Sequence, residues 1–233
     1  LVRKAPALSD VLAILTWSAS APMSRDLLQA LLPDASPLDL TDALERGQGL
    51  RLLRRVPGTD RYAIHRLVAE VRRKQDTPSP DWLTSTGHHL ADWFEEIRNE
   101  FEHLDAYEAN LDHLEEWAAR LASVDAPLSA RLTWLQAYPS YHRGQPHQIL
   151  DLIEKAWSRL GDGDAESESL QGHLLHDEGY ARGALGEHSR ALALREEALA
   201  IRKRALGDNK TAEEKKNDNL CEKHRSKKKN TRA

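Results

Sequence analysis

A repeat of small and aromatic residues with a 42-residue period constrains the fold of this chain more than any other feature of its sequence. The residues that superpose under this shift are Gly144 with Gly186, Ala137 with Gly179, Tyr138 with Tyr180, Ile149 with Ala191, Leu152 with Leu194, and Ala156 with Ala198. Small side chains let two helices approach closely, and glycine after a helix allows the left-handed backbone of a tight corner. A period of this length is typical of a solenoid in which stacked helical pairs share a continuous core.

Apolar residues recur at helical spacing from Trp82 onward, and no strand-like alternation interrupts them. The spacing predicts six helices, and the short joints between them favour antiparallel pairs. The predicted helices are 82–101, 104–122, 128–142, 147–160, 169–185 and 188–206. We therefore assign residues 82–207 to one region of helical repeats.

Residues 8–75 carry a mixed pattern instead. Ser9, Ser24 and Ser36 are each expected to cap a helix. Two short apolar segments then flank the turn-forming residues 57–60, which predicts a β-hairpin, and a further helix begins at His65. Three helices, a hairpin and a closing helix are the order of a winged helix-turn-helix module.

The segments on either side of the helical repeats are polar. Residues 76–81 hold two prolines among small polar residues, so we expect a linker there. Residues 208–233 are rich in Lys and poor in apolar side chains, so we expect a disordered tail. The chain begins with Leu1 and not with Met, as a piece of a longer protein would.

Composition argues against several classes of protein. The chain is 40% hydrophobic and 30% charged, and its formal net charge of −4 gives no argument for binding to nucleic acid or to a membrane surface. No run of apolar residues approaches the roughly 18 that a membrane span requires. Cys221 is the single cysteine, which fits a reducing compartment. We expect a cytoplasmic protein that binds neither membrane nor nucleic acid.

The last helical pair resembles a tetratricopeptide repeat (TPR) of the longer kind found in kinesin light chains and in many bacterial proteins. Gly179, Gly186, Ala191 and Ala198 fall where that family places its small residues. Glu178 departs from the pattern because it occupies a usual Leu position, and the preceding pair is a degenerate match. The resemblance implies an α-solenoid whose partner is a protein or a peptide.

In the TPR family, fixed positions on the first helix of each pair face the bound partner. The matching residues here are Arg131, Trp134, Tyr138, Tyr141 and His142 in one pair, and His173, His176 and Tyr180 in the next. Aromatic side chains and arginine are enriched at interface hot spots. Packing between helices is the alternative for Trp134 and Tyr138. A binding role predicts that Trp134→Ala or Tyr138→Ala weakens a partner without unfolding the chain.

Residues 8–207 resemble, in the order of their parts, the region that follows the nucleotide-binding core in NB-ARC proteins of the STAND ATPase class. The triplet Ile64-His65-Arg66 matches a motif whose histidine contacts bound ADP in that family, although Arg66 stands where Asp is usual. The resemblance implies that His65 senses nucleotide only with a core domain upstream in the parent protein. Local capping of the following helix is the alternative.

Other reactive groups do not assemble into a recognisable site. No Gly-x-x-x-x-Gly-Lys-Ser/Thr loop exists to cradle phosphates, so we expect no NTPase activity. The close histidine pairs, His88 with His89 and His173 with His176, have no third ligand at regular spacing. No nucleophile elbow and no carboxylate dyad can be identified. We therefore expect no metal, no cofactor and no catalytic residues.

Together these features predict a mainly α-helical protein, with a winged-helix-like module carrying a small β-hairpin followed by an α-solenoid of TPR-like helical hairpins. We expect it to be the sensor and relay segment of a bacterial STAND-type signalling ATPase, without the nucleotide-binding core. One alternative is a DNA-binding transcriptional regulator with a TPR effector-sensing region, although the third helix carries Asp39, Asp42 and Glu45, which phosphates would repel. Another is a plain TPR adaptor.

Overall fold

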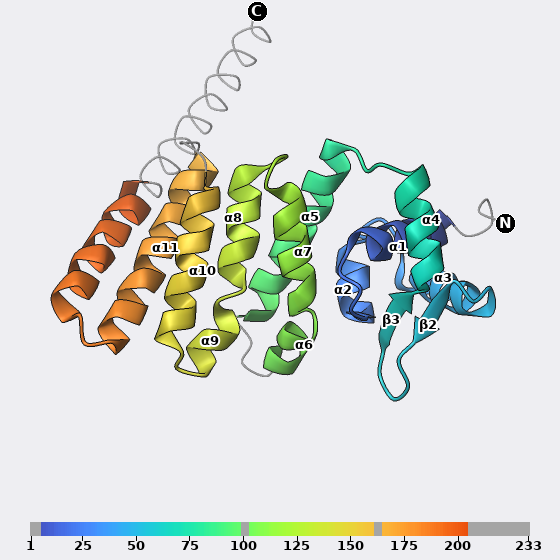
Figure 1. Ribbon diagram of the computed structural model, residues 1–233, viewed down its shortest axis with the longest axis horizontal. Coiled ribbons are helices and arrows are strands. Elements are labelled where there is room, and N and C mark those ends of the chain that lie inside the picture. The colour runs from blue at the N-terminus through green and yellow to red at the C-terminus, as the bar shows by residue number, and fades with distance from the viewer. Residues whose placement is uncertain (1–5, 99–102, 161–164, 205–233) are drawn as a thin grey trace, which may run out of the picture. The chain divides into compact units, whose positions relative to one another are not determined.

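The computed structural model describes residues 6–98, 103–160 and 165–204, which are mainly helical with a small three-stranded sheet (Figure 1). The chain forms two compact units that divide between Gly161 and Asp162. The predicted tail, residues 208–233, lies outside the described residues.

The first unit opens with a mixed module. Its elements are α1 (Pro6–Trp17), β1 (Met23–Ser24), α2 (Arg25–Ala30), α3 (Pro37–Gly49), β2 (Leu53–Arg55), β3 (Arg61–Ile64) and α4 (Arg66–Gln75). Strand β3 is central and pairs antiparallel with both neighbours, so that Met23 lies opposite Tyr62 and Leu53 opposite Ile64. The predicted hairpin is confirmed, but β1 was not predicted, because two residues are too few to show strand alternation.

Local capping explains where two of these helices begin. The Ser24 hydroxyl accepts a hydrogen bond from the Leu27 amide at 3.3 Å, and Ser36 forms a reciprocal capping box with Asp39. Both predicted caps are confirmed. The predicted cap at Ser9 is wrong, because α1 already begins at Pro6 and buries Ala7 and Leu8 in the core.

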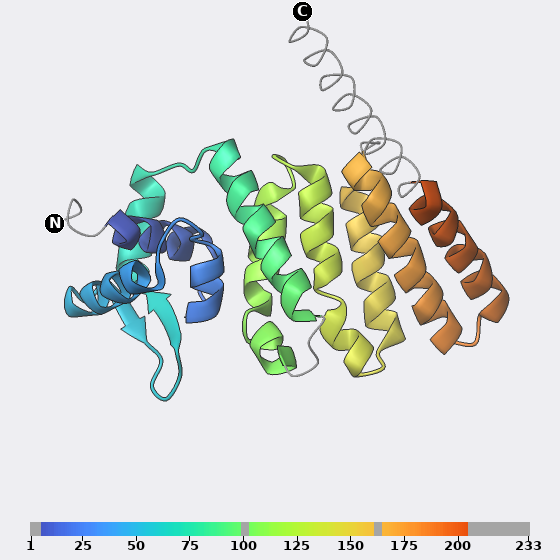
Figure 2. The same cartoon turned by 180° about the vertical axis from the view of Figure 1, so that it is seen from behind.

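The rest of the first unit is helical. It contains α5 (Pro80–Arg98), α6 (Leu104–Ala109), α7 (Leu111–Leu121), α8 (Ala126–Leu135), α9 (Tyr138–His142) and α10 (Pro146–Arg159). Helices α5, α7 and α8 pack on one another, and α8 also packs on α10 (Figures 1 and 2). Within the segment predicted as a linker, residues 76–79 have no regular secondary structure and α5 begins at Pro80.

Two helices that the sequence predicts as continuous are each divided in the structure. The helix predicted over 104–122 breaks at Asn110, whose side chain bonds to Ser24 instead of pointing to solvent. The helix predicted over 128–142 breaks before Pro139, which has no N–H to donate to the Leu135 carbonyl. That carbonyl accepts the Tyr107 hydroxyl at 2.6 Å instead.

The second unit is a helical hairpin made of α11 (Ala165–Ala184) and the helix over residues 188–204. Its corner at Gly186 has φ +83°, and the corresponding corner before α10, at Gly144, has φ +60°. Both corners need the left-handed backbone that the 42-residue repeat predicted. The helices also approach closely, because a Cβ added to Gly179 would lie 3.0 Å from the Ala191 carbonyl oxygen.

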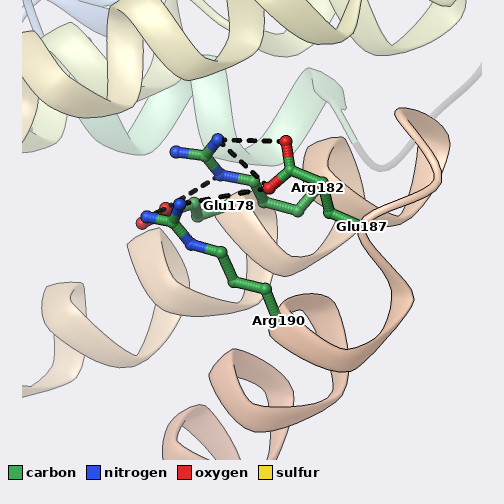
Figure 3. Close-up of polar contacts among 4 residues, drawn as sticks. All are labelled: Glu178, Arg182, Glu187 and Arg190. Carbon is green, nitrogen blue, oxygen red and sulfur yellow. Dashed lines mark hydrogen bonds and ion pairs between the residues drawn. The ribbon is translucent and has the colours of Figure 1, made fainter.

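An ion-pair network lies next to the corner of this hairpin (Figure 3). The Glu178 carboxylate bonds to Arg182 at 3.2 Å and pairs with Arg190 at 3.4 Å, and Arg182 also reaches Glu187 at 3.4 Å. Only 16% of the Glu178 side chain is exposed, so its two arginine partners offset the cost of burying the charge. The carboxylate that departs from the TPR pattern thus joins the two helices of the hairpin.

Candidate functional site

The predicted binding residues of the earlier pair lie on α8 and α9, and most of them are engaged within the first unit. The Arg131 guanidinium pairs with Glu95 at 2.8 Å and with Asp92 at 2.9 Å, both on α5. Burial alone would lower the pKa of Arg131, but the two carboxylates raise it above its usual value. Arg131 therefore clamps α8 to α5.

Trp134 is 4% exposed, and the Arg98 guanidinium lies 4.5 Å from the centre of its ring. This geometry suits a cation–π contact. The indole thus contributes to the core of the first unit, which favours the packing alternative for this residue.

Tyr138 and His142 belong to a row of aromatic rings that sequence periodicity did not reveal. The Tyr138 ring lies 4.7 Å from Tyr107 and 4.6 Å from His142, and Tyr107 in turn lies 4.6 Å from Phe94. Phe94 and Tyr107 are fully buried, Tyr138 is half-buried and His142 is exposed. The row therefore runs from the core of the unit to its surface. Tyr141 is half-buried beside it on α9.

The predicted binding residues of the later pair lie on α11 in the second unit. His176 is exposed, Tyr180 is 42% exposed, and His173 is half-buried. The neighbouring face of α11 carries Gly172 and Gly179, which pack against the helix over residues 188–204. Helix α11 thus uses small residues for its own hairpin and presents imidazole and phenol groups beside them.

His65 is exposed at the start of α4, where its Nδ1 accepts the Leu67 amide at 3.3 Å. Its own backbone N–H donates to the Leu52 carbonyl at 2.8 Å. The next residue, Arg66, pairs with Glu70 at 2.8 Å. His65 therefore caps α4 in this chain, and its predicted role toward a nucleotide stays a prediction.

A polar joint between the mixed module and the following helices was not predicted. The Trp117 Nε1–H donates to the Ser18 hydroxyl at 3.0 Å, and Asn110 exchanges two hydrogen bonds of 3.1 Å with Ser24. Arg61 Nη2 donates to the carbonyls of Pro22 and Ala109. Sequence carries only one hint of this joint, an asparagine inside an apolar helical pattern.

His113 on α7 lies fully buried beside this joint. Burial disfavours the charged imidazolium and lowers the pKa of His113 to about 4, although the nearby Pro22 carbonyl partly opposes the shift. The imidazole is therefore neutral at pH 7.

The described residues contain no group of three or more His, Cys, Asp or Glu side chains placed to hold a metal ion. None of the helices in that part of the chain has the length and apolarity needed to cross a bilayer. Among protein-family models, curated proteins and solved structures, none matches this chain.

Proposed function

We propose that this chain is the partner-binding and relay segment of a bacterial STAND-type signalling ATPase and has no catalytic activity of its own. TPR-like hairpins bind a protein or peptide, and a winged-helix-like module passes that event to a nucleotide-binding domain elsewhere in the parent protein. His65 is assigned to the nucleotide only when that domain is present.

The two faces of α11, one packed and one exposed, carry the binding part of the proposal. One face of the helix is reduced to glycine where it meets its hairpin partner, while His176 and Tyr180 are exposed one turn apart beside that face. An aromatic ring next to a hydrogen-bonding imidazole provides the apolar area and the polar specificity of a binding hot spot.

The polar joint supports the relay part. Hydrogen bonds connect the module to α6 and α7 at Ser18, Ser24 and Arg61, so a displacement of these helices changes the surroundings of β1 and β3. Relays of this kind depend on interfaces that have two discrete packings.

The binding part is tested with a peptide selected from a random library against the whole chain. The double substitution His176→Ala with Tyr180→Ala should weaken that peptide about tenfold or more, as loss of a hot spot does. The matched control is Leu192→Ala with Leu199→Ala, which truncates residues that are 59% and 52% exposed on the second helix of the same hairpin. Equal losses in both variants, or no loss in the first, would remove the basis for the binding surface on α11.

A further inference from the structure

A cavity of about 440 Å³ lies in the first unit between α1, the connection from α2 to α3, and α5. Its volume is within the range of roughly 300–1,000 Å³ that is usual for small-molecule pockets. Asp10 and Ile14 on α1 are four residues apart, and so are Trp82 and Thr86 on α5, so each helix turns one face to the cavity. The face of α5 is mostly polar here, whereas Leu90 and Phe94 of the same helix are buried in the core.

The cavity has an apolar floor and one aromatic wall. Ile14 and Leu31 line it and are 2% and 4% exposed. The Trp82 ring is half-buried and lies 5.7 Å from Trp117, which is fully buried and bonded to Ser18. Trp82 therefore packs against a buried ring of the core.

The lining is mostly acidic. Asp10, Asp34 and Asp39 line the cavity and are exposed, and no Lys or Arg lines it among the described residues. The half-buried His89 on α5 also lines it. Asp39 is occupied by its capping box with Ser36, whereas Asp34 makes no hydrogen bond or ion pair with any residue the structure describes. Burial raises the pKa of Asp10, and the nearby Arg72, which opposes that shift, is already paired with Asp76 at 3.4 Å.

Thr86 places a hydroxyl group in the wall of the cavity. This residue is 5% exposed, and its hydroxyl makes no hydrogen bond to the described part of the chain. The hydroxyl oxygen is not one of the buried side-chain atoms that lack a partner, so it is open to the cavity. It can therefore accept a hydrogen bond from a donor carried by a bound molecule.

We propose that this cavity binds a small organic cation, an ammonium or guanidinium group carried on an apolar stem. Asp10 and Asp34 attract the charge, the face of Trp82 adds a cation–π contact, and the Thr86 hydroxyl accepts an N–H of the ligand. The apolar floor at Ile14 and Leu31 takes the stem, which an inorganic cation lacks. The site is lined by residues of the first unit, none of which belongs to the hairpin of the proposed function, and it does not depend on that function.

The test is isothermal titration calorimetry of the whole chain with phenethylamine and with agmatine. Both should bind saturably, while 3-phenylpropionate, which matches phenethylamine in shape but carries a negative charge, should not. Asp10→Asn with Asp34→Asn should weaken amine binding about tenfold or more, and Thr86→Val should weaken it while keeping the volume of the side chain. The control is Asp42→Asn with Glu45→Gln, because both carboxylates are exposed on α3 outside the cavity.

Each result decides the assignment. Weaker amine binding in the cavity variants, with unchanged amine binding in the α3 control, supports the cation site. Binding of the carboxylate, equal affinity in all variants, or no saturable heat at millimolar amine would overturn it. Far-ultraviolet circular dichroism of each variant ensures that a loss reflects the site and not an unfolded chain.

Discussion

At the scale of single residues, the buried His113 connects protonation to folding. Its pKa is about 4 in the folded chain because burial excludes the charged form, whereas an unfolded histidine has a pKa near 6.5. Above pH 6.5 both states are neutral and the residue has no effect on stability. As the pH falls from 6.5 to 4, the unfolded state binds a proton that the folded state refuses, so stability decreases.

His113 should lower the free energy of unfolding by about 2 kcal/mol between pH 7 and pH 5. Urea unfolding at both pH values measures it. The variant His113→Leu cannot titrate and should lose correspondingly less stability over the same interval. A variant with the same pH dependence as the unmodified chain would show that other groups dominate acid sensitivity.

Because Trp134 is buried, its mutation is expected to lower the stability of the fold and not only to weaken a partner. With only 4% of it exposed, Trp134→Ala leaves a cavity in the first unit and should destabilise the chain by about 3–5 kcal/mol. His142→Ala, on the exposed end of the aromatic row, should change stability by less than about 0.5 kcal/mol. Thermal and urea unfolding followed by circular dichroism compares the two. A stable Trp134→Ala protein would return this residue to the partner-binding set.

At the scale of elements, the stability of the hairpin that contains α11 depends more on Gly179 than on Gly183. A Cβ at Gly179 would lie 3.0 Å from both the Ala191 carbonyl oxygen and the Arg195 Cγ, so Gly179→Ala forces the helices apart. Overpacking of this kind costs about 1–3 kcal/mol. At Gly183 the nearest atom is the Ala191 Cβ at 3.6 Å, which is an ordinary contact.

Gly183→Ala is therefore the matched control for Gly179→Ala. It should be neutral or should stabilise the helix by up to about 1 kcal/mol, because alanine is the better helix former. Melting temperatures of the two variants give the comparison. Equal melting temperatures would mean that the close approach at Gly179 does not limit the hairpin.

The same scale explains which helix boundaries could be predicted. The caps at Ser24 and Ser36 depend on neighbours within three residues, so they were visible in the sequence. The break at Asn110 depends on Ser24, which is 86 residues away. Proline at position 139 was a local signal that the helical pattern around it concealed.

At the scale of the whole molecule, contacts between distant segments join the mixed module to the helices of the first unit. The bond from Trp117 to Ser18 is buried and spans 99 residues of sequence. A double-mutant cycle of Ser18→Ala with Trp117→Phe should give a coupling energy of about 1 kcal/mol, since each single change leaves the other group unpaired. Urea unfolding of the four proteins measures it. A coupling near zero would mean that the joint is held by apolar packing alone.

For the candidate sites too, the sequence predicted some features and only the tertiary structure decided others. The repeat placed Tyr180 and His176 on the first helix of a hairpin, and both are exposed as a binding role requires. It could not tell that Trp134 is buried under Arg98, nor that Asp10 and Trp82 line one cavity. Helical spacing orders residues around one axis, but it carries no information about which other element covers each face.

The sequence by itself determined the mainly helical character of the chain, the starts of α2 and α3, the hairpin and the glycine corners, because these depend on backbone preferences and on neighbours a few residues apart. The tertiary structure decided the third strand, the breaks at Asn110 and Pro139, the burial of Trp134 and His113, and the cavity beside Trp82. These features depend on which surfaces meet across many tens of residues. Such meetings are fixed by the packing of the folded chain and leave no periodic pattern in the sequence.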